Sequence, residues 1–151
     1  MIAYVGFDPG MSGGWGAVDH NGKYLGCGDM PNTDKIINTN VVWMEICQAT
    51  VGMDREFVIE KVGAMPGNGG VSMFNFGAAY MACIAIAQRS MCQWMLVQPR
   101  AWKKDMGLTA DKDESLDMAR ELWPEAPLAR KKDNGRAEAL LIAEWLRRQE
   151  S

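Results

Sequence analysis

The sequence predicts an α/β protein built on a mixed five-stranded sheet, in which three antiparallel strands are followed by parallel additions and helices cover both faces. Two observations support this prediction. Three short apolar segments open the chain, and the last two are joined by Asn21-Gly22, the dipeptide favoured in tight hairpin turns. Beyond residue 40, helical and strand patterns alternate, and a helix between two strands makes a parallel crossover connection.

Local signals set the bounds of each element. Asn40 is placed to cap a helix, and Ser72 or Asn75 is placed to cap the next one. Residues 61–72 contain Pro66 and four glycines without an apolar period, which predicts a loop long enough to have a function. The predicted strands are 2–7, 15–18, 24–27, 57–60 and 94–98, and the predicted helices are 41–51, 73–90, 100–104, 111–123 and 135–148.

Length and composition narrow the class of protein. A chain of 151 residues provides one core but not two lobes, so residues 1–151 are expected to form a single domain. The net charge of −3 argues against a general nucleic-acid coat protein, although basic residues gather locally. Four cysteines without CxxC spacing and a single histidine argue against a zinc site or a disulfide framework. Because no signal peptide and no apolar span near 20 residues is apparent, we expect a cytoplasmic protein without membrane contact.

Three acids occupy positions where ionised side chains are poorly solvated. Asp8 ends the apolar run Ile2–Phe7, Glu60 ends a second apolar run, and Glu138 begins an apolar helix. A desolvated carboxylate needs a counter-charge, a metal or hydrogen-bond donors. In the predicted sheet, Asp8 and Glu60 lie at the carboxyl ends of neighbouring strands, and a helix crossing that edge brings in Glu138. These residues predict a site for a hard cation.

Five blocks in this order resemble the RuvC-like Holliday junction resolvases of the ribonuclease H-like superfamily, especially the phage-type branch. They span nearly the whole chain. The blocks are Gly6–Gly10, Ile59–Val62, Ala64–Gly77, Pro99–Lys103 and Lys131–Ala143.

The resemblance implies a homodimeric, metal-dependent endonuclease that makes paired symmetric nicks in four-way DNA junctions. The implied cofactor is Mg²⁺, with Mn²⁺ as a substitute, and two ions about 4 Å apart would serve each active site. Asp8 would bridge the ions, and Glu60 and Glu138 would each hold one. No small-molecule cofactor is expected.

The fourth ligand position departs from the family pattern. Family members usually carry a histidine or aspartate three or four residues before the last acid, whereas here Asn134 stands four residues before Glu138. Asn134 shares a helix face with Glu138, but its amide carries no charge and cannot shuttle a proton. Asp133 is the charged candidate, provided that the chain bends it inward near Gly135. Both residues are therefore candidate metal ligands.

The DNA-facing residues are expected in three segments. The loop and the following helix start contribute aromatic side chains that stack on bases opened at a junction centre, and at least one of Phe74 and Phe76 should be accessible because one helix face cannot bury both. Trp102 is expected in the core. Basic residues near the metal site are expected to contact phosphates. The candidates are Lys61, Asn68, Ser72, Met73, Phe74, Asn75, Phe76, Arg100, Lys103, Lys131, Lys132 and Arg136.

Two other functions are compatible with parts of the pattern. Actin-like and sugar-kinase-like ATPases also open with a strand, an acid and a glycine turn, but those folds need a second lobe and a second phosphate loop. A non-catalytic junction-binding module on the same fold is favoured by Asn134 and by the acidic net charge. Cleavage of DNA when magnesium or manganese is added separates this module from the nuclease.

Overall fold

A central sheet of five strands organises the molecule. The computed structural model describes residues 1–151. The strand order is β3-β2-β1-β6-β7, with antiparallel pairing among β1, β2 and β3 and parallel pairing of β1 with β6 and of β6 with β7. The predicted mixed sheet is confirmed. Its strands are β1 (Ile2–Asp8), β2 (Gly14–Asp19), β3 (Tyr24–Asp29), β6 (Asp54–Glu60) and β7 (Gln93–Val97).

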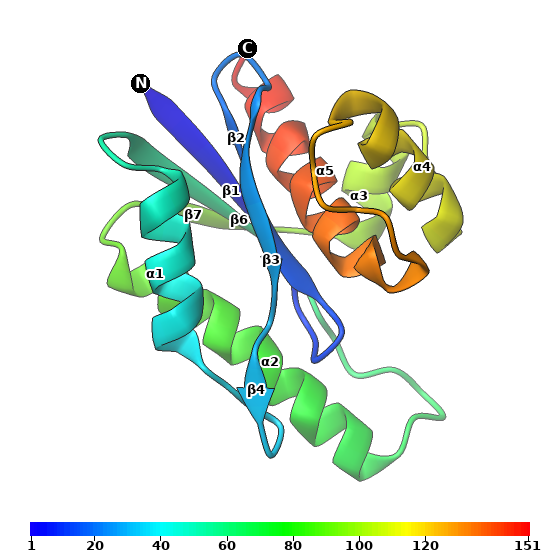
Figure 1. The fold of residues 1–151 in the computed structure, drawn as a ribbon. Helices are drawn as coiled ribbons and strands as arrows, with labels where there is room; N and C mark the ends of the chain where they lie inside the picture. Colours follow the sequence, from blue (N-terminus) through cyan, green and yellow to red (C-terminus); the bar gives the residue numbers. More distant parts are fainter.

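Helices cover the two faces of this sheet in two groups (Figure 1). One face carries α1 and α2, and the other carries α3, α4 and α5, of which α5 lies along the central strands. A 3₁₀ turn, Lys131–Asp133, leads into α5. The helices are α1 (Thr39–Ala49), α2 (Gly70–Arg89), α3 (Pro99–Asp105), α4 (Lys112–Leu122) and α5 (Asn134–Gln149).

Alternation along the strands divides the core into two layers. In β1, Tyr4 points to the cluster formed with α3, α4 and α5, whereas Val5 and Phe7 point to the cluster formed with α1 and α2. Strand β6 follows the same rule, with Val58 on the first side and Phe57 on the second. Both faces of the central strands are thus buried, as expected for strands in the middle of a mixed sheet.

Several predicted boundaries are wrong. Helix α1 is capped by Asn38, whose side chain accepts a hydrogen bond from the Val41 amide, and not by Asn40. Helix α2 begins within the predicted loop and follows Gly69, so neither Ser72 nor Asn75 caps it. The N-cap residue, Gly69, has no side chain that could cap the helix. The sequence therefore held no capping signal from which the start of α2 could be predicted.

A second sheet of two short strands was not predicted. Strands β4 (Asn32–Thr33) and β5 (Ile36–Ile37) form a hairpin between β3 and α1. Its turn residues, Asp34 and Lys35, have φ angles of 52° and 65°. Two-residue hairpin turns of this backbone type are usually marked by Asn-Gly or Asp-Gly, so Asp-Lys gave no signal.

Helix α2 is, by length and composition alone, apolar enough to cross a membrane. The expectation that the chain has no apolar span near 20 residues is therefore wrong. A core helix of a soluble protein passes the same test, and α2 buries Ala79, Cys83 and Ile86 against the sheet. This helix also has an exposed side with large apolar residues, among them Val71 and Phe74.

Candidate active site

Neighbouring strands β1 and β6 each end in an acid at the same edge of the sheet. Their parallel register pairs Phe7 with Ile59, so Asp8 and Glu60 are the next residues on adjacent strands. Glu138 comes from the second turn of α5. All three carboxylates line one open cavity of about 540 Å³. The structure therefore brings together the three acids that the sequence singled out.

Close packing of α5 on the sheet sets the position of Glu138. A Cβ atom on Gly6 of β1 would overlap the carbonyl oxygen of Ala139. At the start of the helix, a Cβ atom on Gly135 would overlap the backbone of the turn at Ser12. Only glycine allows these approaches, and they hold the first turns of α5 beside the ends of the strands.

Two of the acids are oriented by neighbouring side chains. The indole Nε1 of Trp102 donates a 2.6 Å hydrogen bond to Glu60 Oε2. The ammonium of Lys103 lies 3.1 Å from Glu138 Oε1, to which the Ser115 hydroxyl also donates at 3.3 Å. Trp102 is fully buried, as predicted. Its polar edge explains its position, because a buried indole N–H needs an acceptor.

Burial and neighbouring anions raise the pKa values of Asp8 and Glu60. Desolvation raises the pKa of Asp8 well above its ordinary value, and the negative charges of Glu138 and Glu60 raise it further. Desolvation also raises the pKa of Glu60, although the hydrogen bond from Trp102 opposes this shift. A carboxylate whose ionised form is disfavoured by neighbouring carboxylates is stabilised by a bound cation. The cavity is therefore suited to a positively charged ligand.

Comparison with solved structures shows the same architecture. Thermus thermophilus RuvC in complex with a Holliday junction substrate superposes with a TM-score of 0.72 at 17% sequence identity, covering 99% of this chain and 96% of RuvC. A second Thermus thermophilus RuvC structure superposes with a TM-score of 0.68 at 20% identity, covering 98% of this chain and 96% of that one. The chain has the RuvC fold.

The resemblance found in the sequence to RuvC-like resolvases is thus confirmed at the level of the fold. A local sequence match adds a chloroplastic Holliday junction resolvase, MOC1 of Chlamydomonas reinhardtii, which is 54% identical over 50 residues. The match covers 30% of this chain and only 6% of that longer protein. No family model matches the sequence.

Within this RuvC fold, the donor set fits a hard divalent metal. Asp8, Glu60 and Glu138 all offer carboxylate oxygens, the ligands that Mg²⁺ and Mn²⁺ prefer. The side chains are not gathered into a coordination shell, since no three Asp, Glu, His or Cys side chains lie close enough to hold an ion together. Lys103 and Trp102 instead satisfy two of the acids. A metal at this site would have to draw those acids toward Asp8.

The two candidates for the fourth ligand position have different surroundings. Asn134 is the first residue of α5 and lies one turn before Glu138 on the same face, as predicted. Asp133 is buried and is held by Arg130, whose guanidinium donates at 2.7 Å. Desolvation of Asp133 is outweighed by the hydrogen bonds from Arg130, which lower its pKa. Neither residue lines the cavity of the three acids.

Four of the predicted DNA-facing residues line this cavity: Ser72, Asn75 and Phe76 from α2, and Lys103 from α3. Phe74 is 77% exposed on the outer side of α2, which confirms that at least one of the two phenylalanines is accessible. Met73 is half-buried, and its sulfur accepts a hydrogen bond from the backbone amide of Met65. Met73 therefore ties the glycine-rich loop to the first turn of α2.

The remaining predicted DNA-facing residues lie outside the cavity. Arg136 is bound by both oxygens of Asp29, at 2.7 and 3.0 Å, so its guanidinium is already occupied. Lys131 lies 3.9 Å from Asp113 in an exposed ion pair. The others are exposed and stay predictions: Lys61, Asn68, Arg100 and Lys132.

Two lysines at the cavity were missed by sequence reasoning. Lys112 begins α4, and its charge lowers the pKa of both Asp8 and Glu60 against the larger effect of desolvation. Lys35 reaches the cavity from the tip of the unpredicted β4–β5 hairpin. Lys112 stands at the start of the helix predicted over residues 111–123, where a charged side chain is ordinary, and Lys35 gave no signal because its hairpin was not recognised.

Proposed function

We propose that this chain is a metal-dependent, structure-selective DNA endonuclease that resolves four-way junctions by paired symmetric nicks. The observation that supports this proposal is the convergence of Asp8, Glu60 and Glu138 in one open cavity whose rim carries lysines. Phosphodiester hydrolysis needs anionic oxygens to hold cations and needs positive charge for the phosphate, and the cavity supplies both. The names of the related proteins, RuvC and MOC1, are those of Holliday junction resolvases.

The side chains have distinct parts in this mechanism. Asp8, Glu60 and Glu138 would hold the divalent metal, which activates a water and stabilises the leaving oxygen when bound. Trp102 donates its 2.6 Å hydrogen bond to Oε2 of Glu60, so Oε1 is the oxygen that would hold the metal. Lys103 pairs with Glu138 at 3.1 Å, and if Glu138 held a metal instead, the Lys103 ammonium at the cavity wall would be available to bind the scissile phosphate.

The test is cleavage of a synthetic four-way junction beside a linear duplex of the same sequence. We expect nicks at symmetric positions in the junction with Mg²⁺ or Mn²⁺, no nicks with chelator, and no cutting of the duplex. Tight junction binding without cutting under every metal condition would favour a non-catalytic junction-binding module, which the uncharged Asn134 supports. Neither binding nor cutting would contradict both functions.

We further propose that the chain acts as a homodimer joined through an apolar stripe on the exposed side of α2. The stripe consists of Val71, Phe74, Ala78, Met81 and Ala85, which recur with a spacing of three and four residues and are all exposed. Such a dimer would place Phe74 at the seam and leave Phe76, which lines the cavity, as the base-stacking candidate. This is the spacing by which two helices pack along a seam. Paired nicks in opposed strands require two active sites, and each chain has one cluster of three acids.

Met81→Glu is expected to convert the dimer to a monomer, because two charges would be buried at the seam. Light scattering after gel filtration at micromolar concentration measures the mass directly. Met44→Glu is the matched control: Met44 is 58% exposed on α1, against 56% for Met81, and lies outside the apolar stripe. A wild-type protein that stays monomeric, or a Met81→Glu variant that stays dimeric, would contradict this interface.

A further inference from the structure

A second cavity lies directly beside the candidate active site. It has a volume of about 340 Å³. Both cavities are lined by the turn Met11–Gly13, which connects β1 to β2 and separates them. The two cavities therefore share one wall, and the volume of the second lies in the range of pockets that hold small ligands.

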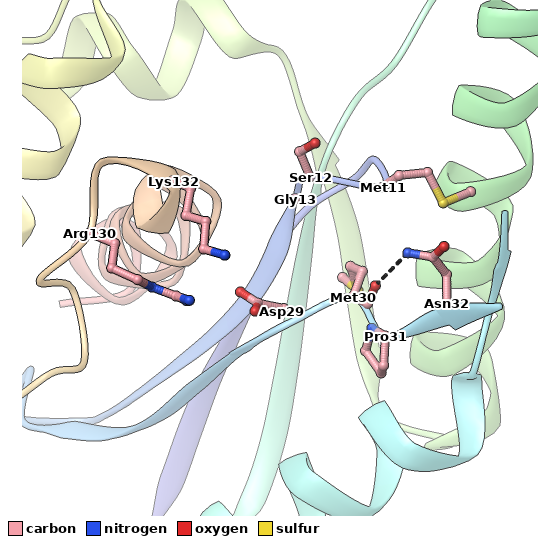
Figure 2. Close-up of a pocket in the computed structure, with 9 residues that line it drawn as sticks. All are labelled: Met11, Ser12, Gly13, Asp29, Met30, Pro31, Asn32, Arg130 and Lys132. Atoms are coloured by element: carbon pink, nitrogen blue, oxygen red, sulfur yellow. Dashed lines mark hydrogen bonds between the residues drawn. The ribbon is translucent and has the colours of Figure 1, made fainter. Parts of the chain in front are cut away.

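The walls of this cavity combine positive charge with hydrogen-bonding groups (Figure 2). Arg130 and Lys132 come from the segment before α5, and Figure 2 shows both side chains directed toward the cavity that Asp29 borders on the opposite side. Asp29 is neutralised by Arg136, and Arg130 by Asp133. Lys132 takes part in none of the ion pairs of the chain, so its ammonium is free for a phosphate.

Asn32 is the side chain best suited to recognise a base in this cavity. Its Nδ2 donates one hydrogen bond to the Met30 carbonyl oxygen at 3.3 Å, which orients the amide plane (Figure 2). The second N–H and the carbonyl oxygen Oδ1 remain available. One donor beside one acceptor is the arrangement by which asparagine binds the N6 and N7 positions of adenine.

The β4–β5 hairpin connects the two cavities. Asn32 at its base lines the second cavity, and Lys35 at its tip lines the cavity of the three acids. Asp34 and Lys35 both hold left-handed backbone angles, which aspartate tolerates but which are unfavourable for lysine. The hairpin thus places one cation at the cavity of the three acids and one amide at the second cavity.

We propose that the second cavity holds the nucleotide next to the scissile phosphate, with Lys132 on its phosphate and Asn32 on its base. This inference rests on the proposed endonuclease function and adds the source of its sequence preference. Adenine is the base expected at the position that Asn32 contacts. Contacts to phosphate position the strand, whereas the contact to the base selects where it is cut.

The first experiment measures cleavage preference with a library of four-way junctions randomised around the crossover. The wild-type protein is expected to favour adenine at one position next to the cut. In Asn32→Ala this preference is expected to fall by roughly 5- to 100-fold at that position alone, the discrimination of a bidentate amide–base pair. Thr33→Ala is the matched control, because Thr33 lies next along the hairpin but lines a different cavity. An Asn32→Ala profile identical to wild type would overturn the base contact.

The second experiment tests the phosphate contact with junctions that carry a neutral methylphosphonate at single positions near the cut. Neutralising the phosphate in the second cavity is expected to slow cleavage by the wild type several-fold. Lys132→Ala has already lost the contact to this phosphate, so its cleavage rate is expected to be the same with and without the methylphosphonate. Lys23→Ala is expected to keep the wild-type sensitivity, because Lys23 is exposed in the turn between β2 and β3, at the end of the sheet away from the acids. If cleavage by Lys132→Ala were slowed by methylphosphonates at the same positions and to the same extent as cleavage by the wild type, the contact between Lys132 and the phosphate would be overturned.

The outcomes separate this inference from the function on which it rests. Junction cleavage by the wild type with unchanged profiles in both variants contradicts the nucleotide site and leaves the endonuclease intact. A wild type that cuts no junction contradicts the endonuclease, and the proposed nucleotide site with it.

Discussion

Asp8→Asn is expected to lower junction cleavage by roughly 10³-fold or more, to the level seen with chelator. Besides desolvation, the negative charges of both Glu138 and Glu60 raise the pKa of Asp8, so Asp8 interacts with each of the other two acids. Asparagine keeps the shape of the side chain but loses the charge that a bound metal requires. The measurement is the single-turnover cleavage rate with saturating Mg²⁺.

Asp54→Asn provides the matched control. Asp54 is exposed at the opposite end of β6, so its replacement removes one carboxylate from the same sheet without touching the cavity. Wild-type cleavage is expected for this control. An Asp8→Asn variant that cuts within a few-fold of wild type would contradict the assignment of Asp8 to the metal site.

Asp8→Asn is also expected to stabilise the metal-free protein, by an amount that depends on pH. Folding raises the pKa of Asp8, so as pH rises from about 4 the unfolded chain loses the proton first, and the folded state of the wild type is progressively destabilised. The asparagine side chain of the variant does not titrate. The melting temperature of Asp8→Asn in chelator should therefore exceed that of wild type by a margin that grows with pH and levels off above the raised pKa.

With added Mg²⁺, the wild type is expected to have the higher melting temperature of the two proteins. Binding to the folded wild type raises its melting temperature by mass action, whereas the variant gains less. Thermal unfolding between pH 4 and pH 8, with and without metal, measures both effects. A constant difference between the two proteins across this range would show that Asp8 is not held in a desolvated, anion-rich environment.

Gly6→Ala is expected to destabilise the fold by about 3 kcal/mol, and to lower the melting temperature by about 6–12 °C. The new methyl group would overlap the carbonyl oxygen of Ala139 and crowd the amide nitrogen of Ala143. Backbone atoms in the middle of α5 cannot turn aside as a flexible side chain would. The helix would have to lift from β1, which also displaces Glu138 from the acids at the strand ends.

Gly77→Ala is the control of opposite sign. Gly77 lies inside α2, and a methyl group added there would have no neighbouring atom within 4 Å, so alanine is expected to stabilise the helix by up to about 1 kcal/mol. Thermal unfolding in chelator compares the two variants. A neutral Gly6→Ala would mean that α5 does not depend on close approach to β1.

The strands and acids were predictable because their signals are local. Asp8 and Glu60 each follow a continuous apolar run, and two parallel neighbours necessarily end at the same edge of a sheet. Glu138 was predictable from its place at the start of an apolar helix. The neighbouring positions of Asp8 and Glu60 could be predicted once β1 and β6 were expected to be adjacent parallel strands.

The hairpin and the second cavity were not predictable for the opposite reason. Strands of two residues, such as Asn32–Thr33, have no period, and the backbone angles of Asp34 and Lys35 are imposed by their surroundings. The bond between Trp102 and Glu60 joins residues 42 positions apart. Such contacts depend on how α3 packs against the sheet, which no local pattern specifies.

The direction of two elements has a practical consequence for handling the protein. Strand β1 runs toward the acids and ends at Asp8, whereas α5 begins beside the acids and runs away from them. Both ends of the described chain consequently emerge at the far end of the sheet (Figure 1). An affinity tag, a fluorophore or a surface tether at either terminus would leave the edge that carries the three acids facing outward, which suits the protein to immobilised single-molecule tests of junction binding.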